Sequence, residues 1–239
     1  MLVLVTRPQK DAERFAHLLE QAGHTALISP VLTIEKTEHS IRGESFNAVI
    51  ITSTNALNIL NDERQKYRDI LALPAYVVGA QTGSAAREAG FESILEIAPD
   101  SQSLLRSVPK DFAAPAHFLY LTGENRKPVL EASLRDAGHQ ITVVVLYRAA
   151  TTASLSGEAI LALRAGKIDA ITHFSRRSAE IFARIIRSGD LQDQCRTVLH
   201  ACLSDDVAAG LAEIAPSRIA TATSPNAAAL LELVESIGK

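Results

Sequence analysis

Hydroxyl-bearing residues follow most of the apolar runs in this chain, at the points where a strand would give way to a helix. A serine or threonine at a helix start accepts a hydrogen bond from a backbone N–H, and its own O–H can hold an anion. The helix N-terminus adds a partial positive charge at the same place. An anion site and routine helix capping are therefore the two readings of Thr6, Ser53, Thr82, Thr122, Ser175, Ser204, Thr223 and Ser224.

Basic side chains stand beside several of these hydroxyls, at Arg7, Arg126, Lys127, Arg148, Arg176 and Arg177. For any single hydroxyl, helix capping is at least as good an explanation as a ligand. If two domains pointed these strand ends at one shared cleft, however, the set would suit a ligand with several negative charges. The pattern thus predicts a cleft for a polyanion.

The residue patterns of the better-known catalytic sites are missing. Residues 77–83, VVGAQTG, follow a predicted strand but match neither G-x-G-x-x-G nor G-x-x-x-x-G-K-[ST]. The histidines form no H-E-x-x-H pair, and there is no G-x-S-x-G turn. Asp205 and Asp206 begin a predicted helix, where carboxylates complement the helix dipole. We therefore expect neither a metal nor a cofactor.

Tyr147 is the side chain that differs from this background. It is one of only four tyrosines, and it closes a predicted strand beside a candidate linker. A phenol stays protonated at neutral pH and can donate a hydrogen bond to a departing hydroxyl. Packing in the linker is the alternative role for this ring.

The elements that position these residues are indicated by residues 46–60, FNAVIITSTNALNIL. An apolar run, a polar turn and apolar residues at helical spacing predict a buried parallel strand that feeds a capped helix. The same pattern recurs in residues 168–182, IDAITHFSRRSAEIF, with Ser53 and Ser175 standing 122 residues apart. A period this long indicates a duplicated domain rather than a solenoid.

Two further repeats fix the order of the units. Residues 75–89 resemble residues 197–211, and LLEQAGH, ending at His24, resembles SLRDAGH, ending at His139. With strand–helix units named a to e, the chain reads a-b, then a complete c-d-e-a-b, then c-d-e. One domain is therefore split and the other is inserted into it, as a circular permutation of the first.

The predicted fold class is α/β, with two flavodoxin-like, doubly wound parallel-sheet domains joined by a two-stranded hinge. We place the split domain at 1–34 and 151–239, the inserted domain at 38–147, and the hinge linkers at 33–38 and 147–152. Among the elements, we expect a strand at 26–32, polar linker at 33–43, and helices at 63–71 and 125–137.

Composition places the chain among ordinary globular proteins. It has 239 residues, 47% of them hydrophobic, and a formal net charge of −3. That charge gives no reason to expect nucleic acid or an anionic membrane as a partner. Cys195 and Cys202 lack C-x-x-C spacing and are expected to be free thiols, and the apolar start is too short for a signal peptide. We expect a cytoplasmic location.

Several stretches, taken in order, resemble the uroporphyrinogen-III synthase family. They are VTRP at 5–8, the TSTNA turn at 52–56, VVGAQTGSAAREAGF at 77–91 and VLYR at 145–148. The split-domain order agrees with them, and the resemblance runs over nearly the whole chain. The chain departs from the family in carrying Asp205 after Ser204, where the family often has Thr, and Glu124 after a strand end.

The resemblance implies a cofactor-free, cyclising hydro-lyase that acts as a monomer on the linear tetrapyrrole hydroxymethylbilane. Water is lost to give an azafulvene, ring D attacks through a spiro intermediate, and ring D is inverted before closure in the interdomain cleft. Tyr147 would be the catalytic residue. A non-enzymatic two-domain protein that binds a small anion is the alternative. The expected substrate-binding residues are Thr6, Arg7, Ser53, Asn55, Gly79, Thr82, Gly123, Arg126, Ser175, Arg176, Ser204 and Ser224.

Overall fold

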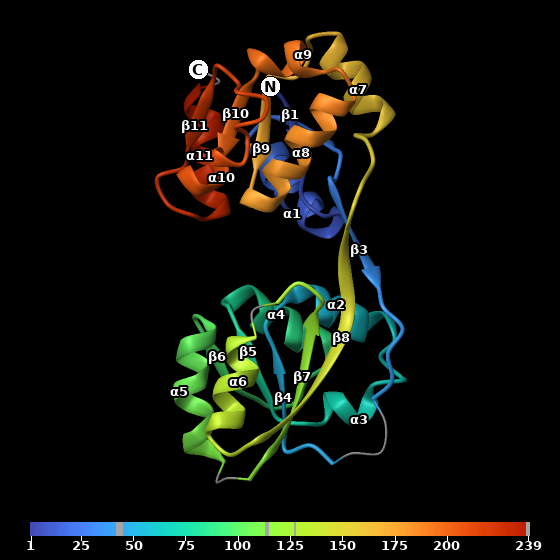
Figure 1. The fold of residues 1–239 in the computed structure, drawn as a ribbon, viewed down its shortest axis with the longest axis vertical. Helices are drawn as coiled ribbons and strands as arrows, with labels where there is room; N and C mark the ends of the chain where they lie inside the picture. Colours follow the sequence, from blue (N-terminus) through green and yellow to red (C-terminus); the bar gives the residue numbers. More distant parts are fainter. Residues whose placement is uncertain (42–44, 113–114, 127, 238–239) are drawn as a thin grey trace. The chain divides into compact units, whose positions relative to one another are not determined.

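The computed structural model describes residues 1–41, 45–112, 115–126 and 128–237 of the chain. It divides into two compact units (Figure 1). The split unit comprises Met1–Thr33 and Ala150–Lys239, and the inserted unit comprises Ile34–Ala149. Lys127, one of the basic residues named above, lies outside the described residues.

The split unit is built on a five-stranded sheet in the order β11-β10-β9-β1-β2, in which every pairing is parallel. Phe15 and Leu19 of the first helix pack against Val3 and Val5 of the first strand on one face. The strands are β1 (Leu2–Val5), β2 (Thr25–Ile28), β9 (Ala170–His173), β10 (Leu199–Cys202) and β11 (Ile219–Thr221). The helices are α1 (Gln9–Gln21), α7 (Gly157–Arg164), α8 (Arg176–Ser188), α9 (Gln192–Arg196), α10 (Asp205–Ala209) and α11 (Ala227–Ile237).

The inserted unit has a six-stranded sheet in the order β3-β8-β7-β4-β5-β6. Val49 and Ile51 pack into one core and Ala48 and Ile50 into another, so the central strand is buried on both faces. The strands are β3 (Leu32–Lys36), β4 (Ala48–Ile51), β5 (Ala75–Val78), β6 (Ile94–Ala98), β7 (His117–Gly123) and β8 (Gln140–Thr151). The helices are α2 (Thr54–Asp62), α3 (Arg68–Leu71), α4 (Ala80–Ala89), α5 (Ser101–Asp111) and α6 (Val129–Asp136).

Both sheets follow the same order once the permutation is taken into account. When the strands of repeats a to e are numbered 1 to 5, the split unit has β1, β2, β9, β10 and β11 as strands 1 to 5, in the sheet order 2-1-3-4-5. The inserted unit has β7, β8, β4, β5 and β6 as strands 1 to 5, and apart from the added β3 its sheet has the same order. That is the flavodoxin-like order, so the predicted fold class is confirmed. The repeated histidines also match: Nδ1 of His139 accepts from the N–H of Ala116 at 3.2 Å, and Nδ1 of His24 lies 3.5 Å from the amino group of Met1.

The predictions around residues 26–43 were wrong in part. The strand expected at 26–32 is two strands, because β2 ends at Ile28 and β3 begins at Leu32. β3 then occupies much of the stretch expected as polar linker. It pairs with β8, and the bonds from the N–H of Thr37 to Leu146 O and from the N–H of Thr152 to Val31 O make the pair antiparallel. The two strands form a connecting ribbon (Figure 1).

Some helix boundaries also differ from the predictions. The helix expected at 63–71 is only Arg68–Leu71, since α2 ends at Asp62 and a turn follows. The helix expected at 125–137 begins at Val129, directly after Pro128. The short helix α9 was not expected, because five mostly polar residues give no periodic signal. Within the described ranges, no helix combines the length and the apolarity that crossing a membrane requires.

Candidate active site

The carboxyl ends of four neighbouring strands gather most of the predicted residues of the inserted unit. In sheet order these strands are β8, β7, β4 and β5, and all three pairings among them are parallel. Gly123, Ser53 and Gly79 lie at or directly after the ends of β7, β4 and β5. Tyr147 was expected to close its strand, but β8 continues to Thr151, because beyond Tyr147 it no longer pairs with β7 and instead pairs with β3. Tyr147 reaches the same edge because it stands opposite Gly123, the last residue of β7. Parallel strands place their carboxyl ends at one edge of the sheet, so the topology brings these residues together.

Tyr147 and Ser53 are in direct contact although they lie 94 residues apart. The Tyr147 hydroxyl donates a hydrogen bond to Oγ of Ser53, with 2.8 Å between the two oxygens. Ser53 is the N-cap of α2, and its Oγ also accepts the backbone N–H of Asn55 at 3.2 Å. Both side chains are partly exposed. The phenol is thus tied to the start of a helix.

Gly123 makes room for the tyrosine ring. It stands opposite Tyr147 in the β7–β8 register. A Cβ at position 123 would lie 2.6 Å from Cε2 and Cζ of Tyr147 and 2.9 Å from its hydroxyl oxygen. These distances are far below normal contact, so any side chain at 123 would move the ring. Gly123 therefore has a structural role that its prediction as a substrate-binding residue did not include.

The next strand end carries Gly79 and Thr82. Gly79 is the N-cap of α4 with a φ of +88°, a conformation that favours glycine. Thr82, in the first turn of α4, is almost fully buried, so its hydroxyl faces protein rather than solvent. Asn55, in the first turn of α2, is partly exposed. Gly79 and Asn55 are therefore better placed than Thr82 to meet a ligand.

The split unit repeats this arrangement with different contacts. Ser175 caps α8, accepting from the N–H of Ser178 at 3.1 Å and donating to its hydroxyl at 2.8 Å. Ser204 caps α10 by accepting from the N–H of Val207 at 3.4 Å, and Ser224 accepts from Nδ2 of Asn226 at 2.8 Å. Thr6 is buried and donates to the carbonyl oxygen of Thr172 at 2.9 Å. Thr6 therefore holds two strands together.

Four of the arginines named above are engaged with carboxylates of their own unit. Arg7 lies 3.5 Å from Asp11 and 4.1 Å from the centre of the Phe174 ring, and burial lowers the pKa of its guanidinium. Arg176 contacts Glu180 and Asp206 at 3.0 Å each. Arg126 pairs with Glu131, and Arg148 with Glu35. A bound anion would have to compete with these carboxylates.

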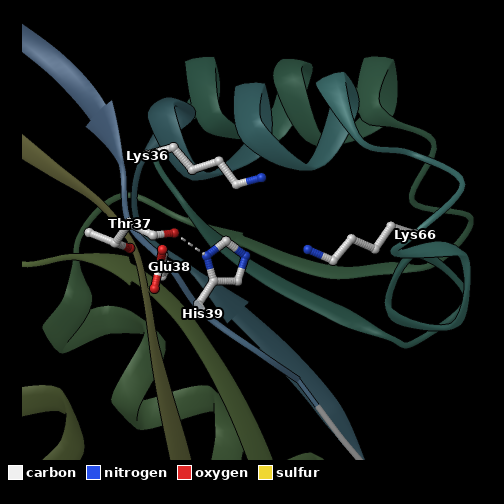
Figure 2. Close-up of a pocket in the computed structure, with 5 residues that line it drawn as sticks. All are labelled: Lys36, Thr37, Glu38, His39 and Lys66. Atoms are coloured by element: carbon white, nitrogen blue, oxygen red, sulfur yellow. Dashed lines mark hydrogen bonds between the residues drawn. The ribbon is translucent and has the colours of Figure 1, made fainter.

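A pocket of about 320 Å³ in the inserted unit was not predicted (Figure 2). His39 donates from Nδ1 to the carbonyl oxygen of Thr37 at 2.8 Å, and Nε2 then accepts from the Tyr67 hydroxyl. Burial lowers the pKa of His39, and the charges of two nearby lysines lower it further, against the raising effect of the Thr37 carbonyl. The imidazole is therefore neutral at pH 7. The lining residues are Lys36, Thr37, Glu38, His39 and Lys66.

The two lysines of this pocket, Lys36 and Lys66, extend toward the space beside the imidazole (Figure 2). Both also contact the carboxylate of Glu63. That carboxylate offsets part of the positive charge, so the pocket is not assigned to an anion. Its residues give no motif, because β3 and the turn after α2 meet only in the folded unit.

A buried histidine pair lies in the split unit. Nε2 of His173 and Nδ1 of His200 are 3.0 Å apart, and Nε2 of His200 lies 3.1 Å from the carbonyl oxygen of Cys195. Burial lowers the pKa of His200 to about 4, and burial together with the charge of His200 lowers the pKa of His173 well below 6.5. His173 is fully buried.

The described part of the chain contains no group of three or more His, Cys, Asp or Glu side chains that could hold a metal ion. Cys195 and Cys202 are both buried and unpaired, and burial raises the pKa of each thiol to about 12. Both sulfurs therefore stay protonated at neutral pH, as the spacing predicted for free thiols.

Comparisons with known proteins agree with this fold. A structure of uroporphyrinogen-III synthetase from Helicobacter pylori 26695 matches with a TM-score of 0.67 and 19% identity, covering 99% of this chain and 100% of that one. A mutant uroporphyrinogen III synthase from the extremely thermophilic bacterium Thermus thermophilus matches with a TM-score of 0.53 and 19% identity, covering 100% and 99%. These two likenesses show the fold.

Sequence comparison extends the likeness to the family. A protein named "Putative uroporphyrinogen-III synthase" from Methanothermobacter thermautotrophicus is 26% identical over 76% of each chain. The family model described as uroporphyrinogen-III synthase HemD matches residues 13–232, which is most of the chain. This protein belongs to the uroporphyrinogen-III synthase family.

Proposed function

We propose that this protein converts hydroxymethylbilane into uroporphyrinogen III, with loss of water and inversion of ring D. The substrate loses its hydroxyl to give an azafulvene. Ring D then attacks through its substituted carbon, and the spiro intermediate reopens so that the ring closes in the inverted sense. The protein would act as a cyclising hydro-lyase without a cofactor, as a monomer in the cytoplasm.

The observation that carries this proposal is the Tyr147 phenol fixed at the carboxyl edge of the inserted unit. Its ring fills the space over Gly123, and its hydroxyl is 2.8 Å from Ser53 Oγ. A positioned proton donor typically accelerates the loss of a leaving group about 10²–10⁴-fold. We assign to Tyr147 the supply of the proton that turns the departing hydroxyl into water.

The remaining work of the site is to impose geometry. A linear tetrapyrrole whose rings all bear acetate and propionate groups is best oriented by many weak contacts with its carboxylates rather than by one strong contact. Hydroxyls and helix N-termini at Ser53, Ser175, Ser204 and Ser224 suit those carboxylates. The arginines that are now paired with carboxylates of the protein would also contribute to binding, by exchanging that carboxylate for one from the substrate.

Supplying hydroxymethylbilane and separating the products tests the proposal. The type III isomer of uroporphyrinogen should accumulate faster than the type I isomer that forms without an enzyme. Chelation and dialysis should leave this rate unchanged. Tight binding of the substrate with only the type I product would favour the alternative, a two-domain protein that binds an anion without turnover.

A further inference from the structure

The hydrogen bonds at Ser53 determine which proton can reach a ligand. A serine hydroxyl has one O–H donor and two lone pairs. Oγ of Ser53 accepts from the Tyr147 hydroxyl at 2.8 Å and from the N–H of Asn55 at 3.2 Å. Both lone pairs are thus occupied, and the O–H of Ser53 is the donor that is left over.

No further hydrogen-bond partner of Ser53 is found among the described residues. Ser53 is partly exposed and lies at the carboxyl edge of the sheet, where ligands of parallel sheets bind. The proton of Tyr147, in contrast, points at Ser53. Of these two hydroxyls, the one that can present a proton to a ligand is therefore that of Ser53.

We infer that Ser53 delivers the proton to the leaving hydroxyl of the substrate and that Tyr147 replenishes it, so that the two side chains act as a relay. This inference rests on the proposed function and changes the residue that touches the reacting atoms. Ser53 becomes the catalytic residue, and Tyr147 acts through it. Gly123 and the N–H of Asn55 fix the geometry of both.

The proton transfers balance as follows. The C–O bond of the hydroxymethyl group breaks as the electron pair of the pyrrole nitrogen moves toward the ring. The departing oxygen takes the proton of Ser53 Oγ and leaves as water, while Oγ takes the phenolic proton of Tyr147. The phenolate regains a proton when the pyrrole carbon that closes the macrocycle loses its hydrogen. The protein ends the cycle unchanged.

A set of Ser53 variants tests the relay. Ser53→Ala removes the relay oxygen and should lower kcat about 10²–10⁴-fold. Ser53→Asn keeps an oxygen that can cap α2 and accept from Tyr147, but it offers no transferable hydroxyl proton, so it should fold normally and be equally slow. Ser53→Thr keeps the hydroxyl and should restore most of kcat.

Two controls separate folding from chemistry. Ser156 caps α7, and its Oγ accepts from the N–H of Ala159 at 3.2 Å, the same length as the cap at Ser53. Ser156→Ala should therefore lower the melting temperature about as much as Ser53→Ala while leaving kcat unchanged. The double variant Tyr147→Phe, Ser53→Ala should be no slower than either single variant, because each substitution interrupts the same proton-transfer pathway.

The number of protons that are transferred in the rate-limiting transition state gives a second readout. With kcat measured in mixtures of H₂O and D₂O, the relay predicts a curved dependence on the deuterium fraction in the wild type. A straight line, full kcat in Ser53→Asn, or multiplying losses in the double variant would overturn the relay. Failure of the wild type to form the type III isomer would instead overturn the proposed function.

Discussion

The turn after β4 and the turn after β9 occupy the same position in their two sheets, and each ends in a serine that caps a helix. Ser53 and Ser175 have almost the same backbone conformation, with φ of −148° in both and ψ of 136° and 148°. Their side chains nevertheless have different partners. Ser53 accepts from the distant Tyr147, whereas Ser175 donates to Ser178 of its own helix.

The residues at the ends of two corresponding strands, β7 and β1, account for the difference. In the inserted unit β7 ends in Gly123, and the absence of a side chain admits the ring of Tyr147. In the split unit β1 is followed by Arg7, whose guanidinium covers the ring of Phe174. The same duplicated fold therefore carries two kinds of helix cap. Ser175 in the split unit has only local contacts, whereas Ser53 in the inserted unit is bonded to the reactive side chain of Tyr147.

The largest effect should follow from closing the space that distinguishes the two turns. Gly123→Ala places a Cβ 2.6 Å from the ring of Tyr147, so the phenol must leave Ser53. We expect kcat to fall about 10²–10⁴-fold, as for removal of the proton donor itself. Steady-state kinetics with hydroxymethylbilane measures this loss.

Gly157→Ala is the matched control for this substitution. A Cβ at Gly157 would meet nothing within 4 Å, and the residue lies at the start of α7. Activity should be unchanged and the free energy of unfolding slightly increased, by about 0.4–1 kcal/mol. If Gly123→Ala kept full activity, the contact between Tyr147 and Ser53 would have no part in turnover.

A second difference between the two strands should appear as acid sensitivity of the split unit. β9 ends in His173 where β4, 122 residues earlier, ends in the apolar Ile51. The pKa of His200 falls from 6.5 to about 4 on folding, so the unfolded chain takes up protons first as the pH drops. The free energy of unfolding should be full above about pH 6.5 and decline below it, by about 3 kcal/mol for His200 on reaching pH 4.

Denaturant unfolding between pH 5 and 7.5 measures this decline, above the range in which most carboxylates titrate. The double variant His173→Ile, His200→Leu removes both imidazoles and should flatten the curve in this window. His39→Gln serves as a control for the other histidine with a lowered pKa. An unaltered slope in the double variant would assign the acid sensitivity to other groups.

A smaller effect is expected from the serine that keeps its contacts local. Ser175→Ala removes the cap of α8 and should lower the free energy of unfolding by about 1 kcal/mol. Turnover should fall no more than about tenfold and chiefly through KM, since one of many holds on a polyanion is lost. Complete inactivity of a folded Ser175→Ala protein would contradict the proposed difference, in which Ser53 acts in catalysis and Ser175 only caps a helix and contacts the substrate.

The smallest effect should come from the connecting ribbon next to Tyr147. Arg148 and Glu35 lie across from each other at 2.9 Å, and their side chains are 58% and 44% exposed. Exposed pairs contribute about 0–1 kcal/mol and are screened by salt. Glu35→Gln should therefore change stability by less than about 1 kcal/mol and leave kcat intact. A large fall in kcat would mean that this pair helps to hold Tyr147.

The sequence by itself determined the fold class and the duplicated design. The apolar run at 48–51 predicts a buried strand, the repeat at 170–173 follows from its similarity to that stretch, and the serines after both predict helix caps, because these signals are local. The order of the repeats then gave the permuted arrangement. Connections without a periodic apolar pattern were less predictable: only Leu32 of the five residues of β3 is buried, and α9 has five mostly polar residues.

Only the tertiary structure decided which side chains meet. Ser53 follows β4, Gly123 ends β7 and Tyr147 lies in β8. Their contact depends on the β4–β7 and β7–β8 registers, which no local signal specifies. The same holds for the arginines, whose partners Asp206 and Glu35 lie 30 and 113 residues away in the chain. Residue types and spacing identify groups capable of chemistry, whereas long-range packing fixes their distances and therefore their roles.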